Sequence, residues 1–202
     1  SKGAQKIVLD LRGAANGRLQ EGVAVANLFT GSGTIARILG KGDKETATFA
    51  ADPSKVVFNG PLAVVIDRST AGPAEVIAAA VRDQKRGELV GERTFGTGSD
   101  QQLFKLSDEG ALLITTAKYA PATGKAFMEE PVTPTVKVDR PVEAEPILPD
   151  GDDDDDSEDR PDQQPQVTPP KPVQPVEDVQ LKKALEIIKQ TPVKAQAATK
   201  KA

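Results

Sequence analysis

The sequence contains no cysteine, no histidine and no tryptophan, and only one tyrosine and one methionine. These absences exclude a cysteine nucleophile, a Cys/His zinc site and any mechanism that needs imidazole as a base. The lack of cysteine does not distinguish a reducing from an oxidising compartment. We therefore expect no metal and no other cofactor.

Long apolar runs are also missing. No run approaches the roughly 20 residues that span a bilayer, and the chain does not open on a charged and then apolar signal peptide. The net charge of −4, without interleaved basic and aromatic residues, argues against nucleic-acid binding. We expect neither a bilayer-spanning segment nor a nucleic-acid partner.

The apolar residues are concentrated before about residue 130, although the whole chain has 202 residues, 38% of them hydrophobic, and a mean hydropathy of −0.37. We predict a folded core over 1–128, followed by a linker over 129–175 in which proline and acidic residues dominate. This composition cannot bury enough apolar area to fold, so the linker is expected to be disordered. Its acidic run, 152–156, lacks the spaced ligands of a calcium loop. An amphipathic helix over 176–190 and a Lys/Ala tail over 191–202 complete the chain.

The core shows the alternation of strands and helices that is typical of α/β proteins with a mixed sheet. Short apolar runs predict buried strands, and apolar residues at helical spacing predict helices. The last two strands form a hairpin, and 135–138 is compatible with an edge strand. The predicted strands are 6–11, 34–39, 45–51, 61–66, 88–92, 103–106 and 111–117, and the predicted helices are 19–29 and 73–86.

The second helix has clear signals at both ends. Gly72 is the predicted N-cap, Pro73 the first helical residue and Glu75 the third. The Glu75 carboxylate can reach back to the N-cap amide and suits the positive end of the helix dipole. Gly87 is the predicted C′ residue.

Several segments, in order, resemble the carboxyl-terminal processing (tail-specific) proteases. These are L-D-L-R-G at 9–13, V-G-E-R-T-F-G at 90–96, I-T-T-A-K-Y at 114–119 and D-V-Q-L-K-K-A-L from 178. The resemblance covers residues 6 to about 125. It implies a crotonase-like α/β fold, a Ser/Lys peptidase dyad, an extracytoplasmic (periplasmic, bacterial) location and action on protein C-termini.

The same resemblance implies that this chain is a catalytic-core fragment. Family members carry a helical N-terminal part, a PDZ domain and the opening of the core sheet before the segment that begins here. On that basis the sheet edge near 7–11 should be exposed and available to a partner strand.

The positions that carry the dyad in this family hold other residues here. The family's S-A-S-A-S-E pattern places the nucleophile three residues before Glu75, at Gly72. The general-base lysine, twenty-five residues later, falls on Thr97 within Gly96-Thr97-Gly98. Threonine cannot take the proton that a desolvated lysine takes. Gln101 matches the glutamine that supports the dyad.

The loop that supplies oxyanion donors in the family is altered as well. Its N-P-G-G pattern corresponds to Ala14-Ala15-Asn16-Gly17, in which Gly17 is retained. Together with Pro73 and Glu75 at the helix N-terminus, Gly17 marks where an oxyanion would be bound. Arg12, just before this loop, is expected to form an ion pair, with a place in a substrate groove as the alternative.

Ser69 and Thr70 are the alternative nucleophiles, although turn hydroxyls that satisfy backbone amides are the favoured interpretation. No lysine occupies a matching base position, since Lys85, Lys105 and Lys118 fall on a helix end and on hairpin strands. Ser99 is expected in a turn.

We conclude from the sequence that this is a carboxyl-terminal processing peptidase-like domain with a replaced dyad. The hypothesis is a pseudopeptidase that binds peptides or protein C-termini, or assembles with other proteins. The alternative is an active serine endopeptidase with a displaced nucleophile. A third possibility is a part of a longer protease whose catalytic centre lies elsewhere.

Overall fold

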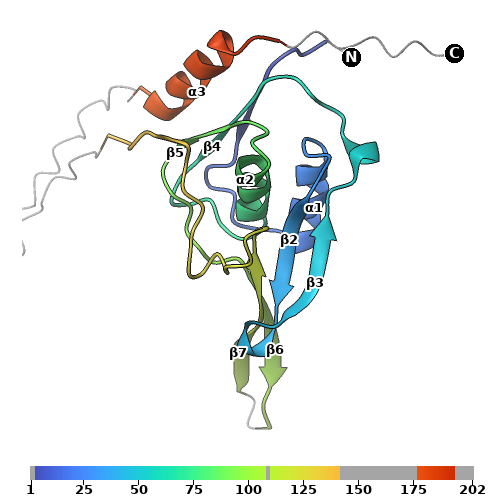
Figure 1. The fold of residues 1–202 in the computed structure, drawn as a ribbon. Coiled ribbons are helices and arrows are strands. Elements are labelled where there is room, and N and C mark those ends of the chain that lie inside the picture. Colours follow the sequence, from blue (N-terminus) through green and yellow to red (C-terminus); the bar gives the residue numbers. More distant parts are fainter. Residues whose placement is uncertain (1–2, 108–109, 142–176, 194–202) are drawn as a thin grey trace, which may run out of the picture. The chain divides into compact units, whose positions relative to one another are not determined.

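The computed structural model describes residues 3–107, 110–141 and 177–193. One compact unit comprises residues 1–140 and 179–202 and carries all the helices and strands described below (Figure 1). The other unit, 141–178, lies almost entirely outside the described residues.

The first sheet is parallel and has the order β1-β4-β5-β8. Its strands are β1 (Ile7–Asp10), β4 (Leu62–Ile66), β5 (Glu88–Gly91) and β8 (Val136–Lys137). All of its pairings are parallel, with Ile7 opposite Leu62 and Ala63 opposite Glu88. β1, β4 and β5 were predicted from their apolar runs, and 135–138 was considered a possible edge strand; β1 and β8 are the edges.

The second sheet is antiparallel and has the order β3-β2-β7-β6. It contains β2 (Thr34–Leu39), β3 (Glu45–Ala50), β6 (Ser99–Lys105) and β7 (Ala111–Ala120). The predicted α/β class with parallel and antiparallel pairing is confirmed, and the two kinds of pairing belong to separate sheets. The prediction of a turn at Ser99 is wrong, because this residue pairs with β7 and begins β6.

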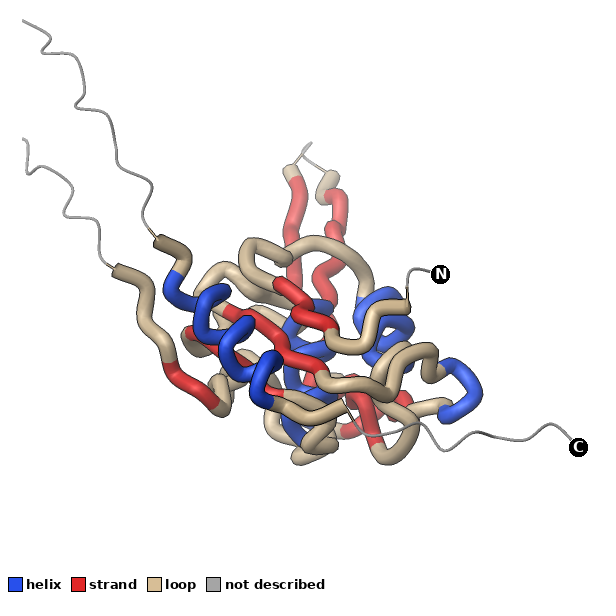
Figure 2. Tube along the Cα trace, turned by 90° about the horizontal axis from the view of Figure 1, so that it is seen from above, coloured by secondary structure: helices blue, strands red, loops and turns tan. Residues whose placement is uncertain are grey.

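Three helices accompany the sheets: α1 (Leu19–Asn27), α2 (Pro73–Asp83) and α3 (Val179–Gln190). Short 3₁₀ turns occur at Lys41–Asp43 and Pro53–Lys55. Figures 1 and 2 show α1 and α2 side by side on one side of the parallel sheet and α3 on the other. The parallel sheet is therefore the middle of three layers.

The side chains of β4 explain this arrangement. Leu62, Val64 and Ile66 belong to the main apolar core with α1 and α2, whereas Ala63 and Val65 belong to a second cluster with α3. Successive strand residues point to opposite faces, so a strand covered on both faces must be apolar throughout. All five residues of β4 are buried accordingly.

The predicted end of α2 is corrected by the structure. The helix ends at Asp83, and Lys85, with φ +51°, takes the left-handed C′ position that was assigned to Gly87. Lys85 N–H donates to Arg82 O and Arg86 N–H to Val81 O, both at 2.9 Å, which is a Schellman motif. Gly87 is required for a different reason: a Cβ there would lie 2.4 Å from Leu62 O.

Residues beyond the predicted core also pack on this unit. Val132 is buried and β8 pairs with β5, while most of the predicted 129–175 linker and of the 191–202 tail lies outside the described residues. The predicted C-terminal helix is confirmed as α3. Among the residues that the structure describes, no helix is both long and apolar enough to cross a bilayer.

The docking of α3 can be tested with two variants of that helix. Ile188 is buried against Ala63, Val65 and Val90, so Ile188→Ala should lower the free energy of unfolding in urea by about 2–4 kcal/mol. Leu185→Ala, at a side chain that is 40% exposed, should have a much smaller effect. Equal losses for the two variants would contradict the described packing.

Candidate functional site

Two loops meet at one edge of the parallel sheet. The loop after β4 leads into α2 at Gly72, and the loop after β5 runs through Thr94 to Gly98. Because the carboxyl ends of parallel strands share one edge, these loops are neighbours, and this edge is where α/β proteins commonly bind ligands. Phe95 N–H donates to Thr70 O (2.9 Å) and links them directly.

The carboxylate of Glu75 joins both loops to the start of α2. Its Oε2 accepts hydrogen bonds from the backbone N–H groups of Gly72 and Thr97, each at 3.0 Å. Its Oε1 accepts from Gly96 N–H (2.8 Å) and from the Thr94 hydroxyl (2.5 Å). The predicted contact between Glu75 and the N-cap amide is confirmed, and positions 72 and 97 are neighbours because they share one carboxylate oxygen.

Glu75 is fully buried, and no ion pair of this carboxylate is found among the described residues. Burial disfavours its charged form and raises the pKa of its carboxyl group above the ordinary value. The four hydrogen bonds favour the charged form and limit this rise. The group is thus held by neutral donors alone.

Gly72 is the N-cap of α2, as predicted, but its backbone is not in the usual extended conformation. Its φ of +57° and ψ of −121° are those of the first central residue of a type II′ turn, a position dominated by glycine. A Cβ there would meet only Ala15 O, at 3.5 Å. Space would therefore admit a side chain, and the backbone conformation is what disfavours one.

The loop over 12–17 lies against the start of α2. Ala71 N–H donates to Ala14 O at 2.9 Å, and a Cβ on Gly17 would approach Pro73 Cγ to 3.7 Å. The structure therefore brings together the residues that the sequence assigned to the oxyanion region. Pro73 has no N–H, so the first helical position cannot donate to an anion. The oxyanion role of these residues stays a prediction.

Thr97 and Gln101 border one groove of about 480 Å³, which Ser99, Thr115 and Met128 also line. Thr97 is exposed and precedes β6, while Gln101 lies within β6, opposite Thr115. The predicted base position and its predicted supporting glutamine thus share a groove. The assignment of Gly72, Thr97 and Gln101 to catalytic positions is carried by the resemblance and stays a prediction.

The alternative nucleophiles are placed differently from each other. Thr70 is buried, and its hydroxyl is within hydrogen-bond distance of Leu11 O (3.0 Å) and Asp67 Oδ1 (3.2 Å) and accepts from Asp67 N–H (3.1 Å). Ser69 is exposed, and its N–H donates to Asp67 Oδ1 (2.9 Å). The Thr70 hydroxyl thus accepts a backbone amide, as the favoured interpretation stated, whereas Ser69 contributes its own backbone N–H to the turn.

Among the lysines named from the sequence, Lys118 is engaged by two carboxylates. Lys118 Nζ binds the carboxylates of Asp43 (3.0 Å) and Glu129 (3.3 Å), and these hydrogen bonds raise the pKa of its ammonium group. Lys85 lies at the end of α2 and Lys105 at the end of β6, as expected. An amine with a raised pKa is a poor proton acceptor near neutral pH.

Two contributors to this edge were missed by sequence reasoning. Thr94 bridges Glu75 and Val132, whose N–H donates to the threonine hydroxyl at 2.9 Å. Gln180 of α3 is buried and donates to Val138 O (2.9 Å), and the Arg12 guanidinium reaches its Oε1 (3.4 Å). Thr94 belongs to the V-G-E-R-T-F-G segment at 90–96, but no sequence signal indicated that its side chain binds Glu75.

Arg12 forms the expected ion pair, with Asp10, at 2.6 Å. No group of carboxylates that could hold a metal ion occurs within residues 3–107, 110–141 and 177–193.

The fold and this edge define a peptidase-like α/β domain, with a strand, a sharp turn and a helix that presents its N-terminus beside a second loop. The chain belongs to peptidase family S41, whose model matches residues 1–138. The resemblance stated from the sequence is therefore confirmed.

Individual relatives agree with this assignment. The chain is 38% identical over 119 residues to a carboxyl-terminal-processing protease of Synechocystis, covering 58% of this chain and 27% of that protein. It is 34% identical over 139 residues to a chloroplastic C-terminal processing peptidase of Tetradesmus obliquus, covering 68% of this chain and 30% of the relative.

Among solved structures, the photosystem II D1 C-terminal processing protease matches with a TM-score of 0.62 and 34% identity, over 68% of this chain and 36% of that chain. The chain spans 27–31% of the length of the first curated relatives that it matches.

The role of Glu75 predicts a pH-dependent effect of Glu75→Gln. The difference in free energy of unfolding, wild type minus variant, should fall as the pH rises. The fall begins near pH 4.3, about the ordinary glutamate pKa, and continues through the raised pKa of the folded state. In that interval the folded protein retains a proton that the unfolded chain has lost.

Urea denaturation of both proteins across this range measures the difference. The variant should also be less stable at neutral pH, since its amide cannot accept two of the four hydrogen bonds, each worth about 1–3 kcal/mol. A difference that grows with pH would contradict this account of the buried carboxyl group.

Proposed function

We propose that this S41 domain is a pseudopeptidase that binds extended peptide segments near protein C-termini without cleaving them. The observation that carries the proposal is the absence of a nucleophilic side chain at Gly72, the predicted nucleophile position. Glu75 still joins the two loops, and Gln101 still borders the groove beside position 97.

Position 97 supports the same proposal. Thr97 contributes its backbone N–H to Glu75, and its hydroxyl cannot act as a base near neutral pH. An active peptidase with a displaced nucleophile finds less support: the Thr70 hydroxyl is buried among backbone partners, and Lys118 is engaged by two carboxylates.

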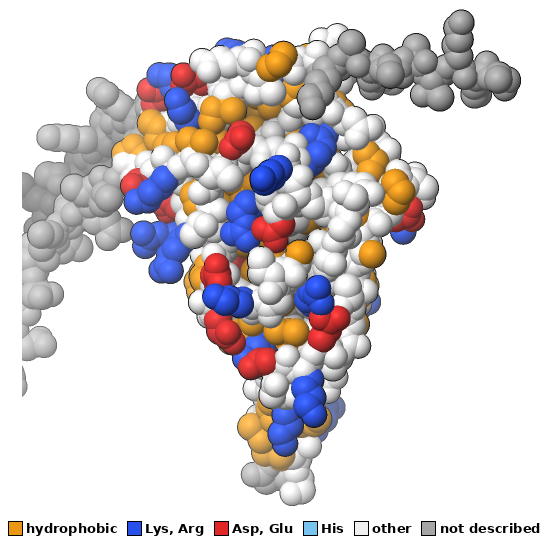
Figure 3. Space-filling model, viewed as in Figure 1, with side chains coloured by type: hydrophobic (Ala, Val, Ile, Leu, Met, Phe, Trp, Pro, Cys, Tyr) orange, Lys and Arg blue, Asp and Glu red, His pale blue; other side chains and the backbone are white. Residues whose placement is uncertain are grey.

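The hairpin of β6 and β7 offers a surface for peptide binding. Over 111–117 no described strand pairs with the outer edge of β7, and β6 is an edge strand. Figure 3 shows hydrophobic side chains at the end of the molecule where Figure 1 places this hairpin. Its exposed apolar residues are Leu103, Phe104, Leu106, Leu112, Leu113 and Ile114. Such an edge can accept a peptide as an added strand.

The edge of β6 is favoured over that of β7 because it adjoins the groove at Thr97. Ser99 and Gln101 of β6 line this groove, so a peptide along β6 would pass beside the predicted dyad positions. The proposed binding partners are protein C-termini, as the names of the relatives suggest. The proposed location is extracytoplasmic.

The catalytic part of the proposal is tested by incubating the protein with an unfolded protein substrate and following cleavage by mass spectrometry. We expect no turnover by the wild-type chain. Turnover that disappears in Ser69→Ala would overturn the pseudopeptidase proposal. Since Ser69 is exposed, this change should leave the fold intact.

The binding part is tested with a pair of proline variants. Leu106 N–H donates to Gly110 O, and hydrogen-bonded and non-bonded pairs alternate along an antiparallel ladder. Leu103 and Leu113, which are opposite each other, therefore form a non-bonded pair. Their N–H groups point outward, that of Leu103 to the β6 edge and that of Leu113 to the β7 edge.

Leu103→Pro should weaken binding of a fluorescent unfolded peptide by at least about tenfold, or about 1.4 kcal/mol, because proline cannot donate to an added strand. Leu113→Pro makes the same change at the other edge and should bind normally. Equal binding by both variants would exclude the β6 edge as the binding site. The replaced dyad is tested separately, by the cleavage assay.

A further inference from the structure

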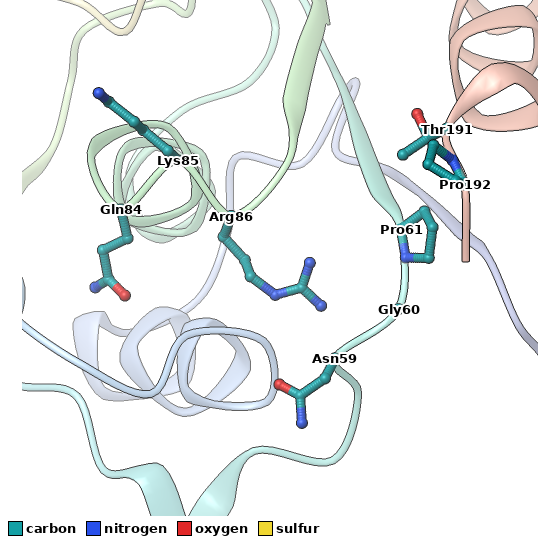
Figure 4. A pocket seen from close by; sticks show the side chains of 8 residues that line it. All are labelled: Asn59, Gly60, Pro61, Gln84, Lys85, Arg86, Thr191 and Pro192. Carbon is teal, nitrogen blue, oxygen red and sulfur yellow. The ribbon is translucent and has the colours of Figure 1, made fainter. Parts of the chain in front are cut away.

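A second pocket lies away from the candidate site, beside the residues that precede β4. It has a volume of about 330 Å³ and lies between three segments (Figure 4). Its lining residues are Asn59, Gly60 and Pro61, then Gln84, Lys85 and Arg86 directly after α2, and Thr191 and Pro192 after α3. Pro61 precedes β4, whereas Gly72 follows it, so the pocket and the candidate site are at opposite ends of this strand.

Arg86 is the charged side chain that points into this pocket. Figure 4 shows its guanidinium group directed toward Asn59, Gly60 and Pro61, whereas Gln84 and Lys85 extend away. Arg86 Nε–H donates to Phe29 O and Nη2–H to Phe58 O, both at 2.8 Å. The group also lies 5.9 Å from the centre of the Phe58 ring.

These partners are neutral and leave part of the guanidinium fork unused. A guanidinium group has five N–H donors, and the two carbonyl contacts occupy one on Nε and one on Nη2. The donors on Nη1 have no partner among the described residues. Burial also lowers the pKa of Arg86, with no nearby charge among its causes.

The other arginines show that this arrangement is unusual in the chain. Within the described segments, each other arginine either pairs with a carboxylate or is exposed. The paired arginines are Arg12, Arg37, Arg68, Arg82 and Arg140, and the exposed unpaired ones are Arg18 and Arg93. Arg86 is partly buried and has no such carboxylate.

Capping of α2 does not account for this side chain. The carbonyl groups of Ala80, Val81 and Arg82 already accept from the backbone N–H groups of Gln84, Arg86 and Lys85. The guanidinium group binds carbonyls of two other segments instead. A partly buried cation without a counter-ion is costly, and a planar fork matches carboxylate or phosphate oxygens.

We propose that this pocket binds a small oxyanion through the free donors of Arg86, with Asn59 as a second polar contact. The ligand class is a carboxylate or phosphate compound small enough for about 330 Å³. The site is independent of peptide binding at the other end of β4.

The test is thermal unfolding of the full chain in phosphate and in succinate, with sodium chloride at matched ionic strength as reference. At least one oxyanion should raise the unfolding midpoint saturably, and the more effective of the two identifies the ligand type. Identical midpoints in all three salts would overturn the proposal.

Variants locate the effect. Arg86→Gln should weaken the oxyanion effect by at least about tenfold, and Lys85→Gln, which removes a charge from a side chain that points away, should leave it unchanged. If Arg86→Gln does not fold, Asn59→Asp replaces it as the test.

Asn59→Asp places a carboxylate in the wall of the pocket and should abolish the oxyanion response. A full response in that variant, or an equal loss in Lys85→Gln, would contradict the assignment of the oxyanion to Arg86.

Discussion

The candidate site depends on one buried carboxylate. Glu75 accepts hydrogen bonds from the N-cap of α2 and from three residues of the loop after β5, so a single side chain fixes how the two loops meet. Because no described cation neutralises it, these donors must stay in place to keep the charge solvated inside the protein. A change in either loop would therefore affect the other through Glu75. This constraint does not require a side chain at Gly72 or a lysine at position 97.

The strands and helices of the core could be predicted because they depend on local sequence patterns. The run Leu62–Ile66 is apolar at every position, which indicates a strand covered on both faces. The amphipathic spacing in α3 predicted a docked helix, and Ala184 and Ile188 are the residues that dock. The Gly-Pro-x-Glu sequence located the start of α2 and the contact of Glu75 with its N-cap. In each case the residues that give the sequence signal lie within a few positions of the element or contact that they predict.

The features that escaped prediction depend on distant or strained positions. Thr94 and Glu75 are nineteen residues apart, and no local pattern indicates that their side chains meet. The end of α2 was misplaced because Lys85 adopts a left-handed conformation that sequence reasoning reserves for glycine. The segregation of pairing into two sheets follows from long-range register. The unpaired state of Arg86 likewise emerges only when segments far apart in the chain are placed together.

The geometry at Gly72 explains why glycine suits the predicted nucleophile position in this fold. A strand that turns sharply into a helix holds its nucleophile in a strained conformation, which costs about 1–3 kcal/mol for a residue other than glycine. Glycine relieves that strain at φ +57°, and the space beside it is open. Thr97 supports the loop through its backbone N–H, which any residue except proline provides. The side chains at the two predicted dyad positions are therefore not the ones that hold this edge together. The stability of this edge is therefore separable from the side chains at positions 72 and 97, because Glu75 binds three backbone N–H groups and the Thr94 hydroxyl instead.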